Sequence, residues 1–201
     1  MTIQNDVYIS ADIEADGPIP GPYSMLAFGL CVAGRFDGSR FEAADPEQQT
    51  FYTELKPISE KFDPKALDVA RLEREQLLRE APQPEEAMRR AAAWMREVGG
   101  DDRVVVVGFP LVYDWLFLYW YFERFLEGDS PISFSSGLDM KTMYQQKAGV
   151  VLGAAGKDDL PGFLRSTRRH THNALDDAIE QAEIFVKLFD WRGDDRAVKP
   201  H

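Results

Sequence analysis

The sequence predicts an α/β fold in which a mixed central sheet, built from an antiparallel meander plus parallel strands, is flanked by helices. Three features support this prediction: strand-like segments crowd the first 55 residues, helical spacing dominates from residue 64 onward, and a β-branched run at 103–107 returns to strand character between helices. The length of 201 residues and the hydrophobic fraction of 44% suit one domain with a sizeable core. We therefore expect residues 1–201 to form a single domain, with its core at about 7–190 and a polar, flexible tail at 191–201.

The first third of the chain has the pattern of an antiparallel meander. Residues 7–13 alternate imperfectly and are rich in β-formers, which predicts a buried strand that ends at a cluster of acids. Residues 25–33 and 39–42 flank a glycine-containing turn at 34–38, as in a hairpin. Residues 50–55 are expected to follow as a third antiparallel strand.

Helical spacing marks much of the remaining chain, with proline at some helix starts and glycine or proline after some helix ends. It predicts six helices, at residues 64–70, 73–80, 84–98, 113–126, 139–147 and 174–189. Between the third and the fourth of them, residues 103–107 form a continuous apolar run, which is typical of a strand covered on both faces. Residues 149–159 combine glycine with charge and are expected to form a loop.

The net charge, the single cysteine and the first ten residues each disfavour particular classes of protein. The net charge of −11 disfavours a protein that coats nucleic acid, but the objection is weaker for an enzyme that grips only a strand end through bound cations. The single cysteine, Cys31, excludes an intramolecular disulfide and a thiolate-only zinc site. The first ten residues lack the charged and apolar regions of a signal peptide, so a cytoplasmic location is expected.

An apolar stretch at residues 104–122 is long enough to cross a bilayer. Gly108, Pro110 and Asp114 interrupt it, and a charge at the centre of a membrane helix costs about 2.5–3.5 kcal/mol. A strand, a turn and a buried helix therefore explain this stretch better, and no membrane partner is expected.

Two acidic side chains end the first predicted strand. Asp12 and Glu14 share one face of it, because side chains at i and i+2 point the same way. Two like charges at the end of an apolar strand repel each other unless a cation lies between them, and carboxylate oxygens suit Mg²⁺ or Mn²⁺. With 34 acidic residues in the chain, an Asp-x-Glu triplet also arises by chance, so alone it assigns no site.

Two further acids lie near predicted helix starts. Asp114 opens an almost wholly apolar helix, where it can serve a site or simply favour the helix dipole as a cap. His172 precedes the last helix, and Asp177 lies in its first turns, near the imidazole. The alternative for this segment is a helix cap followed by solvated acids. His170 is a rival to His172, and the basic stretch 165–170 either holds phosphates of a strand or is a solvated loop.

The order of these groups resembles that of the DEDDh 3′→5′ exonucleases, a ribonuclease H-like family that includes proofreading exonucleases, oligoribonuclease and ribonuclease T. The first family motif is similar to Asp12-Ile-Glu14-Ala-Asp-Gly17 and the second to Tyr113-Asp114-Trp-Leu-Phe-Leu118. The third is similar to His172-Asn-Ala-Leu-Asp-Asp177, with the family's spacing of five between histidine and acid. The resemblance covers residues 7–190.

The resemblance implies an enzyme that releases nucleoside 5′-monophosphates from the 3′ ends of single-stranded RNA or DNA by two-metal hydrolysis. It assigns the general base to His172 rather than to His170. It implies two ions, Mg²⁺ or Mn²⁺, held by four acids: Asp12, Glu14, Asp114 and Asp177. Stand-alone relatives are commonly dimers, which makes a homodimer one expectation.

The resemblance also implies that the backbone around Ala15 and Asp16 meets the 3′ end, with Tyr113 near the scissile phosphate. Family members often have Thr-Thr or Thr-Ala where this chain has Ala15-Asp16, so an extra acid is expected beside the substrate end. The second motif commonly has His-Asn upstream of its acid, where Phe109-Pro110 stands here. Neither change removes a metal ligand.

Two other functions stay open at this point. One is a catalytically idle nucleic-acid-binding or protein-interaction module on the same fold, whose expected signature would be the loss of a ligand. The other is a phosphodiesterase that cleaves small nucleotides.

Overall fold

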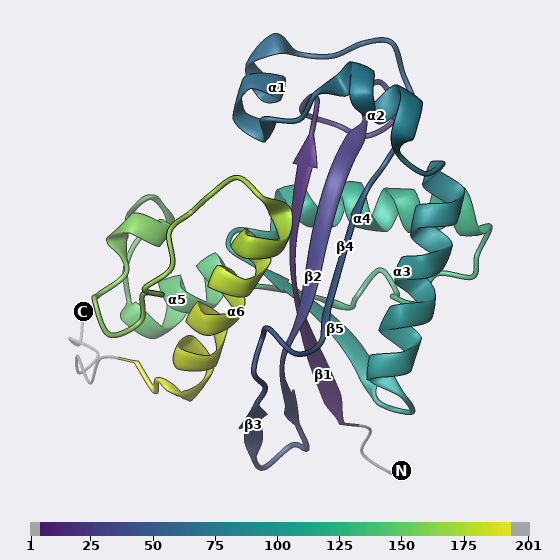
Figure 1. The fold of residues 1–201 in the computed structure, drawn as a ribbon. Coiled ribbons are helices and arrows are strands. Elements are labelled where there is room, and N and C mark those ends of the chain that lie inside the picture. Colours follow the sequence, from purple (N-terminus) through teal and green to yellow (C-terminus); the bar gives the residue numbers. More distant parts are fainter. Residues whose placement is uncertain (1–4, 194–201) are drawn as a thin grey trace.

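The computed structural model describes residues 5–193 (Figure 1). Its strands are β1 (Asp6–Ala15), β2 (Met25–Phe36), β3 (Phe41–Ala43), β4 (Thr50–Glu54), β5 (Arg103–Gly108) and β6 (Gly137–Asp139). They form one sheet in the order β3-β2-β1-β5-β6, with β4 also paired to β2. The pairs of β2 are antiparallel, whereas β1 with β5 and β5 with β6 are parallel. The predicted mixed sheet is confirmed.

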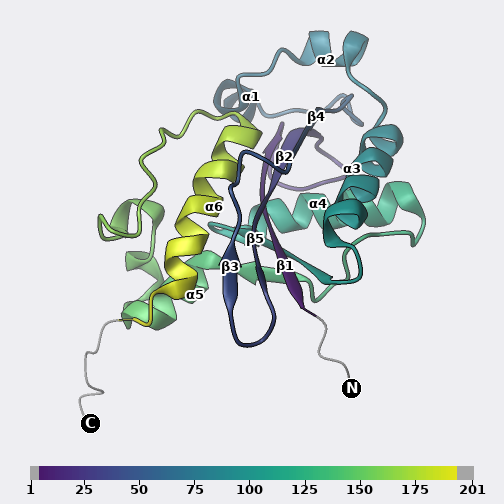
Figure 2. The same cartoon turned by 60° about the horizontal axis from the view of Figure 1, so that its bottom comes forward.

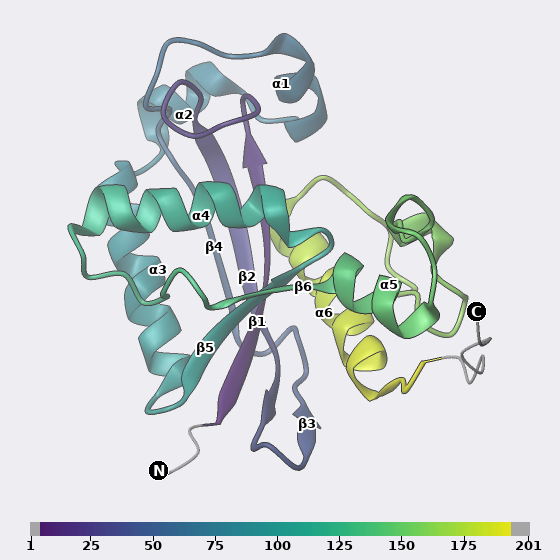
Figure 3. The same ribbon diagram turned by 180° about the vertical axis from the view of Figure 1, so that it is seen from behind.

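Helices cover both faces of this sheet. They are α1 (Pro64–Ala70), α2 (Arg74–Glu80), α3 (Pro84–Gly99), α4 (Leu111–Leu126), α5 (Met140–Ala148) and α6 (Ala174–Asp190). In Figure 3, α3 and α4 lie on one face, α5 and α6 lie toward the other, and α1 and α2 cap the end where β1 finishes. Residues of β1 serve both cores in alternation: Val7 and Ile9 pack with α3 and α4, whereas Tyr8 packs with α6.

Some predicted elements differ in their bounds. The helix expected from residue 113 begins at Leu111, whose N–H donates to Asp139 Oδ2 at 2.7 Å, so Asp114 lies in the first turn instead of opening the helix. Strand β2 continues through Gly34 to Phe36, which moves the hairpin turn to residues 37–40. The expected loop at 149–159 contains two short 3-10 turns, Leu152–Ala154 and Lys157–Asp159.

Strand β6 was not predicted, because three residues are too few for a period of two to be visible. It forms where residues 137–139 pair in parallel with β5. No helix among the described residues is long and apolar enough to cross a membrane. Most of the expected tail, residues 194–201, lies outside the described residues, while Trp191 stacks on Tyr144 with ring centroids 5.9 Å apart.

Helix α6 lies close against β2, as the view in Figure 2 shows. Gly29 of β2 makes this approach feasible, since a Cβ there would collide with the backbone of Ala174 and Leu175 at the start of α6. The position of α6 on the sheet matters for function because the first turn of this helix carries Asp177.

Replacing Gly29 by alanine is expected to destabilise the fold by about 1–3 kcal/mol, because the added methyl group overpacks the β2–α6 contact. Urea unfolding followed by circular dichroism measures the change. Gly162→Ala is the matched control, since a Cβ at Gly162 meets nothing within 4 Å. Equal free energies of unfolding for the two variants would contradict the close packing of α6 on β2.

Candidate active site

Four acidic side chains gather where the central strand β1 ends and where α4 and α6 begin. Asp12 and Glu14 lie on β1, Asp114 in the first turn of α4, and Asp177 in the first turn of α6. Asp12, Glu14 and Asp177 each place one carboxylate oxygen within 4.8 Å of the others. Asp114 lines the same cavity as Asp12 and Glu14. The fold thus brings together residues that are far apart in the sequence.

Neighbouring groups hold two of these carboxylates in place. Asp114 Oδ1 accepts a hydrogen bond from the backbone N–H of Ile13 at 3.1 Å, which ties α4 to β1 between the two acids of that strand. Asp12 Oδ1 accepts one from Gln181 Nε2 at 2.8 Å. Gln181 in turn accepts from the N–H of Phe109 at 2.5 Å, at the end of β5. Each acid is therefore oriented by a different part of the chain.

Gln181 did not stand out in the sequence. Its position four residues after Asp177 places it on the same face of α6, and this helical spacing is the signal that could have identified it. Its side chain is buried and bonded at both ends of its amide. Its role is to position Asp12 against the end of β5.

The turn before α6 folds around the carboxylate of Asp177. Asn173 caps the helix by accepting from the N–H groups of Leu175 and Asp176. Asp177 accepts from the backbone N–H groups of Thr171 and His172, both at 2.9 Å. His172 takes a positive φ of 60° within this turn, a conformation uncommon for a residue other than glycine. These hydrogen bonds therefore hold both the carboxylate of Asp177 and the backbone of the turn in place.

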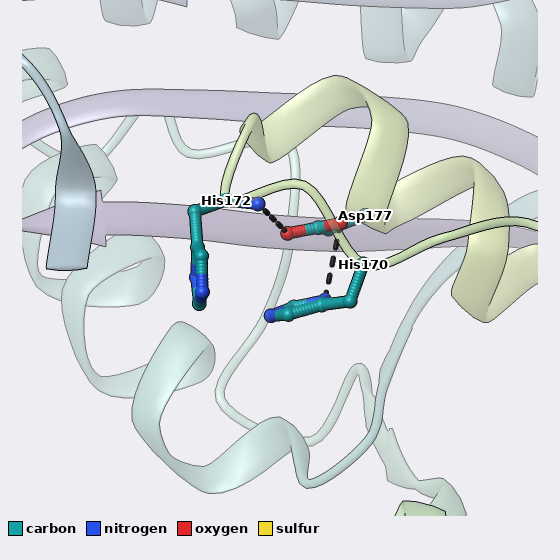
Figure 4. A group of neighbouring side chains, drawn as sticks. All are labelled: His170, His172 and Asp177. Atoms are coloured by element: carbon teal, nitrogen blue, oxygen red, sulfur yellow. Dashed lines mark hydrogen bonds and ion pairs between the residues drawn. The ribbon is translucent and has the colours of Figure 1, made fainter.

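The two histidines of this turn lie side by side, with ring centroids 4.5 Å apart (Figure 4). The imidazole that contacts Asp177 is that of His170, whose Nδ1 lies 3.1 Å from Asp177 Oδ1 and 3.5 Å from Glu180 Oε2. His172 contacts the same acid through its backbone N–H, and its side chain lines the cavity beside Glu14 and Asp114. Both imidazoles therefore lie near Asp177, with ligand atoms within 4.8 Å of one another, and His170 makes the closer contact.

The carboxyl groups are costly to ionise together. Burial raises the pKa of Asp12 well above its usual value, and the charges of Asp114, Asp177 and Glu14 raise it further. Burial, with the charges of Asp177 and Asp114, raises the pKa of Glu14 to about 8. Burial raises the pKa of Asp114 to about 7 despite the hydrogen bond from Ile13. A cation would relieve this repulsion, and a set of oxygen donors fits a hard divalent ion.

The residues expected at the substrate end separate into two groups. Ala15 and Tyr113 line a cavity of about 380 Å³ beside the acids, and the Tyr113 hydroxyl donates to the carbonyl of Gly17 at 2.9 Å. The carboxylate of Asp16 is fully buried and accepts from the N–H of Ser24 instead. A bulge between Glu14 and Ala15 re-aims the strand, so Asp16 does not continue the face of Asp12 and Glu14. The carboxylate of Asp16 therefore does not line the cavity beside Glu14 and Asp114.

A second cavity, of about 550 Å³, adjoins Asp12 on the side of the basic stretch. Arg165 donates to the carbonyls of Leu160 and Asp158, and Arg168 forms ion pairs with Glu183 and Glu47, so both guanidinium groups are engaged within the chain. Lys157 also lines this cavity, and its charge lowers the pKa of Asp12 and of Asp114. Sequence reasoning missed Lys157, which stood in an expected loop.

Comparison with known proteins agrees with this geometry. No family model matches the chain. The chain is 37% identical over 186 residues to the 3′-5′ DNA exonuclease Cap18 of Escherichia coli, an alignment that covers 92% of each protein. Cell-death related nuclease 4 has a similar structure, with a TM-score of 0.64 at 13% identity over 94% of this chain and 64% of that one.

Two further structures share the fold. The nuclease domain of 3′hExo, a DEDDh family member bound to rAMP, gives a TM-score of 0.59 at 16% identity and 92% coverage of both chains. Escherichia coli exonuclease I in complex with single-stranded DNA gives 0.57 at 17% identity over 92% of this chain. The present chain spans 40% of that exonuclease I chain.

The mixed sheet flanked by helices is of the ribonuclease H-like class. The chain belongs to the DEDDh family of 3′→5′ exonucleases and is an enzyme of that kind.

The raised pKa values make the metal-free protein sensitive to pH. Glu14 and Asp114 bind protons more tightly in the folded chain than in the unfolded chain, so the stability they contribute is lost as pH rises through about 7 and 8. In EDTA, the melting temperature is expected to fall by about 5 °C or more between pH 5.5 and pH 8.5. Differential scanning calorimetry measures this fall.

The matched control is Glu14→Gln, which removes one of the titrating groups and should give a shallower fall. Added Mn²⁺ should restore the melting temperature of the unchanged protein at pH 8.5. A melting temperature that rises with pH in EDTA would contradict the burial of these acids.

Proposed function

We propose that the chain removes nucleoside 5′-monophosphates one at a time from the 3′ end of single-stranded DNA or RNA. The observation that supports this most strongly is the convergence of Asp12, Glu14, Asp114 and Asp177, desolvated and mutually repelling, at the end of one strand. The name of the relative Cap18 favours DNA as the substrate, and the rAMP bound to 3′hExo keeps RNA in the proposal.

In this proposal the four acids hold two divalent cations, Mg²⁺ or Mn²⁺. When bound, these cations supply an activated water and stabilise charge on the attacking and leaving oxygens. Asp12 is placed to contribute to both ions, because it is close to Glu14 and Asp177 and faces Asp114 within one cavity. The raised pKa values mean that cation binding releases protons from this group of acids.

His172 is the proposed general base. Its backbone is held by Asp177, so that its side chain lines the cavity beside Glu14 and Asp114, where it can accept a proton from a water near the acids. His170 lines the same cavity, but its Nδ1 lies against the carboxylates of Asp177 and Glu180. The family spacing between His172 and Asp177 supports the same assignment.

The cavity of about 380 Å³ is the proposed site of the terminal nucleoside. Ile13, Ala15, Ala66 and Val69 give it apolar walls suited to a base and a sugar. Tyr113 stands at its edge next to Asp114, where the scissile phosphate would meet the acids. Of the two backbone positions expected there, Ala15 lines the cavity, whereas the N–H and the carbonyl of Asp16 are bonded to other segments.

Purified protein is expected to shorten a 5′-labelled single-stranded oligonucleotide stepwise from its 3′ end, in the presence of Mn²⁺ or Mg²⁺. Asp12→Ala should reduce the rate at least ~1,000-fold, because Asp12 is central to the proposed cation site. Denaturing gels of DNA and RNA oligonucleotides, with EDTA as control, measure the ladder. Intact substrates under every metal condition would contradict the proposal and favour an idle binding module.

The two histidines are distinguished by single substitutions. His172→Ala should lower the rate about 100-fold to 10,000-fold while metal binding persists, because a positioned base contributes that much. His170→Ala is the matched control and should retain most activity. Single-turnover rates and calorimetric titration with Mn²⁺ measure both effects. If His170→Ala is the more damaging change, the assignment of the base is wrong.

A further inference from the structure

Asp16 is the acid in the first motif that departs from the family pattern, and the proposed chemistry does not use it. All of its polar groups are nevertheless engaged. Its N–H donates to the carbonyl of Ser24 at 2.9 Å, and its Oδ1 accepts from the N–H of Ser24 at 2.5 Å. Its carbonyl accepts from the N–H of Asp63 at 2.7 Å, and its Oδ2 pairs with Arg74 Nε at 3.3 Å. Asp16 therefore joins the end of β1 to the segment that contains α1 and α2.

Arg74 also contacts the residues that precede α1. Its guanidinium donates to the carbonyl of Ser59 and lies over the ring of Phe62 at 5.3 Å from the centroid. The side chain of Arg74 is 12% exposed and that of Asp16 is fully buried, so water screens this ion pair only weakly. Removing one partner of such a pair leaves a charge without compensation.

The segment held in this way forms one wall of the proposed nucleoside cavity. Asp63, whose N–H binds Asp16, is the N-cap of α1 and accepts from the N–H of Lys65 at 2.9 Å. Ala66 and Val69 follow at i and i+3 on one face of α1, and both line the cavity together with Glu14 and Asp114. The anchor at Asp16 thus lies directly before the helix that carries this wall.

The geometry points to the Asp16–Arg74 pair as a positioning device that holds α1 against the cavity and sets the affinity for the terminal nucleoside. This inference rests on the proposed function, because it takes the cavity as the nucleoside site. The pair touches neither the substrate nor the metal ligands, so its loss should act on binding and leave the chemical step intact.

The fold is expected to tolerate loss of the pair. Leu26, Leu77 and Ala81 are buried together, and Leu67 and Leu72 pack against them. This small cluster is expected to hold α2 on β2 when the ion pair is absent, while α1, which contributes only Leu67 to it, can shift. Arg74→Gln and Asp16→Asn are therefore expected to fold with a displaced or mobile α1, and Asp16→Asn retains an oxygen that can accept from Ser24.

The test compares Arg74→Gln with Arg79→Gln, which changes an exposed arginine of the same helix. Calorimetry with a nucleoside 5′-monophosphate in Mn²⁺ should show about tenfold weaker binding for Arg74→Gln and none of this loss for Arg79→Gln. KM for an oligonucleotide should rise by a similar factor while kcat and Mn²⁺ affinity stay within about twofold. Arg74→Lys should recover part of the affinity, since it restores the charge.

Val69→Ala tests whether the loss of monophosphate affinity in Arg74→Gln arises from displacement of α1. Made alone, Val69→Ala should weaken monophosphate binding. Combined with Arg74→Gln, it should cause little further loss of affinity, because the wall is already displaced there. Unchanged binding in Arg74→Gln, or a loss confined to kcat and Mn²⁺ affinity, would overturn the inference while leaving the proposed function standing. An unchanged protein that binds no monophosphate and degrades no strand would instead contradict the proposed function.

Discussion

The repulsion among four carboxylates at the end of β1, three of them buried and Asp12 half-buried, is the constraint around which the site is built. Without a cation, three of them hold their protons more tightly than usual, as the raised pKa values of Asp12, Glu14 and Asp114 indicate. The charge of Lys157 lowers the pKa of Asp12 and Asp114, but the ammonium group itself pairs with Glu180. Neutral donors hold three of the four acids: the amide of Gln181 holds Asp12, and backbone N–H groups hold Asp114 and Asp177, so the site keeps its demand for a cation. An arginine in the same place would stabilise the fold but would compete with a metal ion.

The end of β1 also anchors the segment that contains α1 and α2, because a bulge follows Glu14. Up to Glu14, residues two apart share a face, and both acids of the first motif face the site. The irregularity after Glu14 turns Asp16 away, toward Ser24 and Arg74, where its charge is neutralised by an ion pair. One short sequence therefore supplies both the ligands and the anchor for the α1 wall. The position of that wall relative to the acids is consequently tied to the strand that carries them.

Much of the fold was predictable because it rests on local patterns. The apolar alternation of β1, the prolines that start α1 and α3, and the cap before α6 each leave a trace within a few residues. The motif order likewise indicated which four acids converge. What could not be predicted depends on partners distant in sequence: Gln181 meets Asp12 across 169 positions, Arg74 meets Asp16 across 58, and the bulge after Glu14 changes no residue type. The contact of Asp177 with His170, rather than with the imidazole of His172, follows from the fold of a single turn.

The central claim is that cations bind among the acids of β1, α4 and α6. The structure offers a competing set, since His170, His172 and Asp177 also place ligand atoms within 4.8 Å of one another. Crystals grown with Mn²⁺ and a nucleoside 5′-monophosphate, measured at the manganese absorption edge, distinguish the two. The account predicts anomalous peaks between Asp12, Glu14 and Asp177 and between Asp12 and Asp114. Manganese on the two imidazoles, with Asp12 and Glu14 bare, would contradict it.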